Sequence, residues 1–180
     1  MKKCFIKSVF LVLSFLFFTK AETTRAQTFC LRPVIHADLL LLDYPDFVSY
    51  FNFGFSAEAL LVSESASAAG LEIGWGTLDK KWWDHYSGMD IEINKQSTFR
   101  INLFYELAPV DKRIFIQMGG GINISMPYTE VFPTFMLAFG INVFQSETIN
   151  IPLILRSDCM ANSRDIYVPV NLSVGITFKL

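Results

Sequence analysis

The chain has 180 residues, enough for one domain, and 52% of them are hydrophobic, including 18 Phe. Beyond the first 26 residues no apolar run approaches the roughly 20 residues that a membrane-spanning helix needs, which excludes a helical membrane protein. No Cys/His cluster has metal-ligand spacing, so we expect neither a metal nor a cofactor.

The N-terminal segment predicts a cleaved signal peptide. Three lysines within the first seven residues precede the apolar run Ser8–Phe18, which is too short to span a bilayer. Thr24–Ala26 provides a cleavage site with small residues, which predicts cleavage before Gln27. Cleavage after Ala21 is the alternative. A buried N-terminal helix is the competing interpretation. We therefore expect a signal peptide at 1–26 and a single domain at 27–180.

Removal of the signal peptide changes the charge and the cysteine count. The mature chain keeps 10 basic and 16 acidic side chains, a net charge of −6, which argues against nucleic-acid binding. Cys4 leaves with the signal peptide. Cys30 and Cys159 remain, and the strand layout places them at opposite ends of the domain, so we expect no bridge between them.

Apolar and polar residues alternate with period two along almost the whole mature chain, which predicts strands with two different environments on their two faces. In the first expected strand, 28–42, Leu31 and Ile35 share one face, and Arg32, His36 and Asp38 share the other. The segments in which we expect strands follow in chain order as 28–42, 47–61, 71–76, 87–107, 113–126, 133–144, 147–156 and 166–180.

The fourth segment has two interpretations. The alternation at Met89–Asn94 continues without a change of parity into Phe99 and Ile101, which favours one long strand that projects beyond the membrane. A separate hairpin that turns at Asn94 and Lys95 is the second interpretation.

Short and long connections alternate along the chain. We expect short turns at Ser63–Ala68, Ala108–Asp111 and Gln145–Ser146. The other connections are expected at 43–46, 79–97, 127–131 and 157–165. Even strand number, antiparallel neighbours and this asymmetry are typical of outer-membrane barrels. The fold class is therefore all-β: an eight-stranded antiparallel up-and-down transmembrane β-barrel preceded by a cleaved signal peptide.

The side-chain volumes decide which face points outward. One face of the strands is crowded with large apolar residues, whereas the interior of a small barrel has room only for its own side chains. A soluble barrel or sandwich with the apolar face inward is the alternative. With the apolar face outward, the charges of both signs on the other face form a network that plugs the lumen, and unpaired members would be costly. The expected members are Arg32, His36, Asp38, Glu58, Glu72, Arg100, Glu106 and Arg156.

Three stretches carry a family resemblance: the Gly-rich Ile116–Asn123, Ile149–Arg156 and the terminal Gly175–Leu180. Over about 27–180 the chain resembles the small outer-membrane β-barrel proteins, the superfamily that includes the transmembrane domain of outer membrane protein A. The resemblance implies location in the outer membrane of a didermal bacterium. It also implies recognition of the last strand by the barrel-assembly machinery, although the aromatic here is Phe178 and the last residue is Leu180. None of these motifs is specific for an activity.

An aromatic patch is expected in the second outer loop, formed by Trp82, Trp83, His85 and Tyr86. Such residues dominate binding hot spots, but they also form the belt at a lipid headgroup layer, which we favour. His85 and Ser87 further resemble the His-x-Ser pair of outer-membrane lipid A deacylases. Gly88 replaces the usual Asn, and no clear acid follows, so this enzyme is the alternative rather than the main hypothesis.

The sequence thus predicts an outer-membrane barrel without catalysis, with a structural or surface-interaction role through its outer loops. The expected partners are outer-membrane lipid, the assembly machinery and an extracellular ligand at those loops. A lipid-modifying enzyme and a narrow solute channel are the alternatives.

Overall fold

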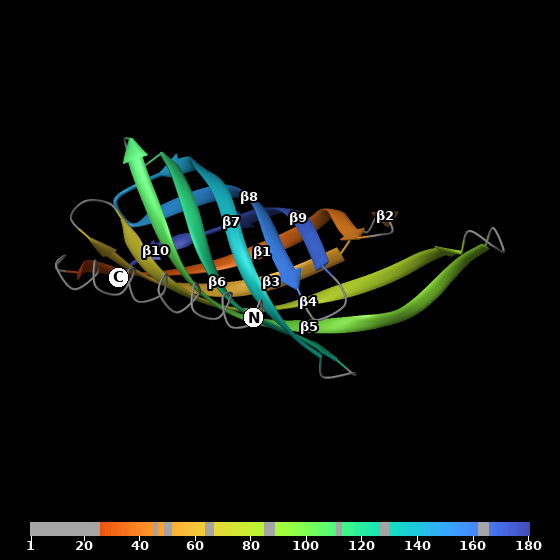
Figure 1. Ribbon diagram of the computed structural model, residues 1–180. Coiled ribbons are helices and arrows are strands. Elements are labelled where there is room, and N and C mark those ends of the chain that lie inside the picture. The colour runs from red at the N-terminus through yellow and green to blue at the C-terminus, as the bar shows by residue number, and fades with distance from the viewer. Residues whose placement is uncertain are drawn as a thin grey trace.

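The computed structural model describes residues 26–44, 47–48, 52–63, 67–84, 89–110, 113–126, 130–161 and 166–180. All regular structure in these ranges is β (Figure 1). The strands are β1 (Ala26–Tyr44), β2 (Phe47–Val48), β3 (Asn52–Ser63), β4 (Ala68–Asp84), β5 (Met89–Val110), β6 (Ile114–Met126), β7 (Glu130–Gln145), β8 (Ile149–Ala161), β9 (Ile166–Gly175) and β10 (Thr177–Lys179). None of the residues in these ranges belongs to a helix long and apolar enough to cross a membrane. The expected signal peptide lies outside them, except for Ala26.

The strands form one closed antiparallel barrel. Each long strand pairs with the next along the chain, and β1 closes the sheet by pairing with β9 as well as with β3. β10 continues β9 after an interruption at Ile176, whose N–H donates to the Pro33 carbonyl at 3.1 Å. The two-residue β2 only extends the edge of β1. The barrel therefore has eight long strands, as the alternation predicts.

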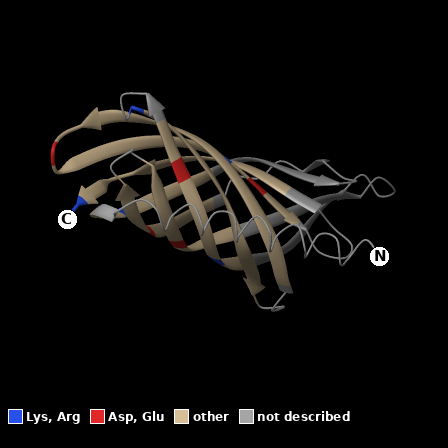
Figure 2. Cartoon of the chain, turned by 60° about the vertical axis from the view of Figure 1, so that its left-hand side comes forward, with Lys and Arg blue, Asp and Glu red and all other residues tan. Residues whose placement is uncertain are grey.

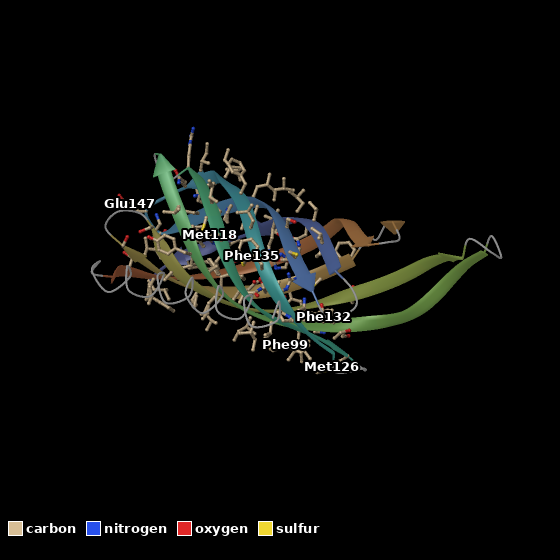
Figure 3. The ribbon with its side chains drawn as sticks, viewed as in Figure 1. Phe99, Met118, Met126, Phe132, Phe135 and Glu147 are labelled. Atoms are coloured by element: carbon tan, nitrogen blue, oxygen red, sulfur yellow. The ribbon has the colours of Figure 1, made fainter. Side chains whose placement is uncertain are left out.

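Burial follows the period-two pattern with the charged face inside and the apolar face outside. Ile35, Phe55 and Val143 are 68%, 58% and 64% exposed, whereas Glu72 is fully buried. Phe99 and Met126 project away from the wall of the barrel (Figure 3). This arrangement is the reverse of a water-soluble core, so the alternative of a soluble barrel with its apolar face inward is wrong.

The fourth expected strand is a single strand. β5 spans 22 residues, and Met89–Ile93 pair with Lys80–Asp84 of β4 beyond a register shift next to Leu78. β4 and β5 consequently extend past the other strands as a projecting hairpin (Figure 1). The hypothesis of a separate hairpin at Asn94 and Lys95 is wrong, because both residues lie within β5.

Several expected boundaries need correction. β4 continues to Asp84 rather than ending at 76, and the predicted loop 79–97 is largely paired strand. A hairpin that projects beyond the barrel has no interior face, so alternation is not required there. Its β5 side keeps the alternation at Met89–Asn94, whereas residues 77–84 on its β4 side do not alternate. β8 likewise continues to Ala161 rather than ending at Arg156.

The end of the barrel that carries the short turns, here called the turn end, has an apolar interior. Phe104 and Met136 are buried with Leu60, Cys30 and Ala68. Phe115 packs with Ala138 and Ile154 in a second cluster. Because an eight-stranded barrel leaves inside only the space that side chains fill, these rings close much of the cross-section.

Glycines give these rings their space. A Cβ on Gly70 would lie 2.2 Å from the Phe104 ring, and one on Gly140 would lie 2.1 Å from the Phe115 ring. The backbone can approach an aromatic face this closely only where a side chain is absent.

Cys30 and Cys159 are free thiols. Cys30 is buried near the turn end, opposite Lys179, whereas Cys159 is exposed on the outer wall, opposite Phe135.

Candidate functional site in the barrel interior

Charged residues are sparse in the wall of the barrel (Figure 2). The members of the expected network whose side chains are described lie in its interior. The register places Arg32, Glu58 and Glu72 side by side on β1, β3 and β4. Since residues directly opposite each other share a face of the sheet, this register carries all three side chains inward. Arg32 and Glu58 belong to one cluster, and Glu72 belongs to a second.

The first cluster surrounds Arg32. Its Nη1 donates to Glu58 Oε2 at 3.0 Å and to Glu106 Oε2 at 2.9 Å. Its Nε donates to the Thr177 hydroxyl at 2.8 Å, and its guanidinium lies 5.2 Å from the centre of the Phe115 ring. One buried cation thus holds two carboxylates above the apolar turn end, in the charge-assisted geometry that makes such pairs strong.

The second cluster surrounds Glu72, nearer the opposite end of the barrel, here called the loop end. Arg156 Nη1 donates to both Glu72 carboxylate oxygens, at 2.9 and 2.8 Å, and Asn102 Nδ2 donates to Oε2 at 2.7 Å. Arg156 Nε donates to Asp158 at 2.8 Å. Arg100 lies further away, 3.9 Å from Glu72 and 3.7 Å from Asp158. Two arginines therefore face two carboxylates.

His36 connects the polar residues of three strands. Its Nδ1 lies 2.7 Å from the Ser173 hydroxyl and its Nε2 lies 2.7 Å from the Ser56 hydroxyl, with Glu72 Oε1 at 3.8 Å. One ring nitrogen donates and the other accepts, depending on the tautomer. The ring is almost fully buried, so both nitrogens are satisfied inside the barrel and neither faces an open cleft.

Asp158 is a member of the second cluster that the sequence analysis missed. We expected the seventh segment, 147–156, to end at Arg156 because Ser157 and Cys159 interrupt its apolar face. Asp158 nevertheless has the parity of Arg156, and its side chain is buried beside it. Continuing the parity of a strand past its apolar residues is the signal that identifies it.

Other predicted residues are described by their backbone alone or lie outside the described residues. The backbone of Asp38 is described, opposite Asn52 and Asn171, but its side chain is not. Trp82 and Trp83 lie on the projecting part of β4, opposite Ile91 and Asp90, again without described side chains. His85, Tyr86 and Ser87 fall between β4 and β5, outside the described residues, so the aromatic patch and the deacylase hypothesis stay predictions. Among the described side chains, no group of three or more His, Cys, Asp or Glu residues could hold a metal ion.

Comparison with known proteins gives a likeness of fold. No family model matches the chain, and no curated protein matches it. The outer membrane protein Ail of Yersinia pestis, solved in a phospholipid bilayer nanodisc, has a TM-score of 0.57 at 5% identity, covering 86% of this chain and 100% of that chain. Neisserial surface protein A has a TM-score of 0.52 at 9% identity, covering 85% and 97%. Ail in complex with the heparin analogue sucrose octasulfate has a TM-score of 0.52 at 7% identity, covering 84% and 99%. The chain therefore has the fold of the small eight-stranded outer-membrane barrels.

Proposed function

We propose that this chain, which has the fold of the small outer-membrane barrels, is an integral outer-membrane protein that acts at the cell surface without catalysis. Its apolar wall faces lipid, its interior is closed to solutes, and its projecting hairpin reaches beyond the membrane on the outer side.

The observation that carries the membrane part of this proposal is the inverted burial pattern. Large aliphatic and aromatic side chains are exposed on strands all round the barrel, whereas arginine and glutamate side chains are buried. Exposed apolar surface on this scale is unfavourable in water and favourable in lipid. Closure of the sheet supports the same conclusion, because every backbone group needs a partner where no water is present.

Two features support a closed interior. The turn end is filled by Phe104 and Phe115. The middle is filled by the ion pairs Arg32–Glu58, at 3.0 Å between nitrogen and oxygen, and Arg156–Glu72, at 2.8 Å. A solute would have to displace both, at the cost of leaving buried charges unpaired. We expect no stable conductance when the folded protein is inserted into planar bilayers. Steady single-channel steps would contradict the closed interior and favour the alternative of a narrow channel.

The surface role rests on the hairpin of β4 and β5, which continues beyond the barrel and carries the Trp82–Trp83 pair. Ail, of similar fold, has been solved with a sulfated sugar analogue, but fold alone does not transfer a ligand. The expected net charge of −6 on the mature chain disfavours a polyanion here. We therefore propose a neutral or basic partner for the outer loops, with lipid headgroups as the neighbours of the tryptophans.

Limited proteolysis of intact cells tests the surface role. Trypsin added outside should cut the hairpin after Lys80, Lys81 or Lys95 and leave the barrel in the membrane. A variant with all three lysines changed to Gln should resist and serves as the matched control. Cleavage that needs permeabilised cells would show that the hairpin faces the periplasm and would refute the surface role.

A further inference from the structure

A small cavity opens off the second cluster toward the loop end of the barrel. The space open to the centre of a water-sized sphere is about 30 Å³. The polar residues of its lining come from five strands and are Thr77, Thr98, Arg100, Asn123, Asp158 and Asn171. A water molecule needs roughly 10–15 Å³ of such space, so the cavity has room for at least one hydroxyl group.

Arg100 brings unused hydrogen-bond donors to this cavity. Its described carboxylate partners are Asp158 at 3.7 Å and Glu72 at 3.9 Å, both too far for a direct hydrogen bond. The guanidinium lies over two glycines: a Cβ on Gly54 would be 3.1 Å from Nη2, and one on Gly74 would be 2.9 Å from Nε. The missing side chains thus allow Arg100 to lie flat at the cavity instead of turning toward its carboxylates.

Asn123 brings an unused acceptor. Its Nδ2 donates to the Met160 sulfur at 3.1 Å, but its Oδ1 has no hydrogen-bond partner among the described residues, although the residue is only 9% exposed. A buried amide oxygen without a partner costs free energy. The cavity consequently offers donors on one side and a carbonyl acceptor on another.

We propose that this cavity is a binding site for one hydroxyl group, supplied by water or by a neutral polyol. A hydroxyl accepts from an Arg100 N–H and at the same time donates to Asn123 Oδ1, so a single group satisfies both side chains. A halide or another simple anion cannot donate to Asn123. A metal ion or an ammonium group cannot accept from Arg100, whose charge repels it.

The charges of the described side chains around the cavity agree with a neutral ligand. Arg100 and Arg156 face Glu72 and Asp158, so the charges of these four residues cancel. Polar groups separated by more than about 3.5 Å are commonly joined through water. The bound hydroxyl group completes the connection between Arg100 and the rest of the cluster, independently of any role of the outer loops.

Crystallography of the mature barrel tests this site under four conditions. Crystals are compared as grown and after soaking in glycerol, sodium bromide or rubidium chloride. We expect an oxygen within about 3.2 Å of both an Arg100 nitrogen and Asn123 Oδ1. Its persistence in glycerol identifies water as the source, and replacement by a glycerol hydroxyl identifies a polyol. An anomalous peak from bromide or rubidium at this position, or no oxygen there, would overturn the proposal.

Two variants complete the test. Asn123→Leu removes the acceptor and should abolish the oxygen. Asn150→Leu changes another amide whose Oδ1 lacks a partner, outside the lining of the cavity, and should leave the oxygen in place. Retention of the oxygen in Asn123→Leu would refute the role of Asn123. The wild-type crystals decide the question if that variant fails to fold.

Discussion

Glu58 and Glu72 lie directly opposite each other on β3 and β4, yet each carboxylate pairs with a different arginine. Like charges in this relationship destabilise a sheet. Arg32 approaches Glu58 at 3.0 Å, and Arg156 approaches Glu72 at 2.8 Å. Since Arg156 comes from β8, on another part of the barrel wall, Glu72 obtains this counter-charge only when the barrel is closed.

The two carboxylates should differ in their contribution to stability. Glu72→Gln leaves Arg156 and Arg100 with Asp158 alone, and breaking a buried pair costs about 3–5 kcal/mol. Glu58→Gln leaves Arg32 with Glu106 at 2.9 Å, so its loss should be smaller. Urea titration of the protein folded in lipid vesicles measures both free energies of unfolding. Equal losses, or a larger loss for Glu58→Gln, would contradict the assignment of partners.

The glycines beside the interior rings should not tolerate alanine. Gly140→Ala places a methyl group against the Phe115 ring, and such overpacking costs about 1–3 kcal/mol. Gly76→Ala is the control, because its nearest neighbour would be Thr98 Oγ1 at an ordinary 3.4 Å. The same urea titration measures both variants, and Phe115→Leu should partly restore Gly140→Ala. A Gly140→Ala variant as stable as wild type would count against this packing.

An arginine on the outer wall should destabilise the barrel according to its depth in lipid. Leu137, in the middle of β7, and Ile114, at the first position of β6, are both exposed. Leu137→Arg should cost about 2–4 kcal/mol and Ile114→Arg about 0–1 kcal/mol, as expected for the bilayer midplane and interface. Vesicle unfolding titrations measure the difference. Two small and equal effects would show that this wall is not in hydrocarbon.

Much of the fold follows from the sequence because a wall between two solvents imposes period two on every strand. The parity of Arg32, Glu58, Glu72 and Arg156 alone assigns them to the interior. The same reasoning fails where both faces of a strand lie in the same environment. Residues 77–84 continue β4 without the alternation that would reveal them, because the hairpin has no interior face.

The parity of a residue shows that it faces the interior, but it does not determine which interior residue it pairs with. Whether Glu72 pairs with Arg100 or with Arg156 depends on strand tilt and register, which the alternation leaves undetermined. Asp158 was missed because the apolar signal ends before the strand does. The position of the Arg100 guanidinium at the cavity depends on the glycines at 54 and 74, whose effect appears only when the neighbouring strands are aligned.

The central claim is that the apolar wall of a closed barrel faces lipid. Its most direct test is to express the full precursor in a didermal bacterium, separate the outer membranes, and compare unboiled and boiled protein on a detergent gel. We predict a membrane-bound species whose mobility shifts on boiling, because the closed barrel resists detergent until it is heated. A soluble periplasmic species without a mobility shift would contradict the claim.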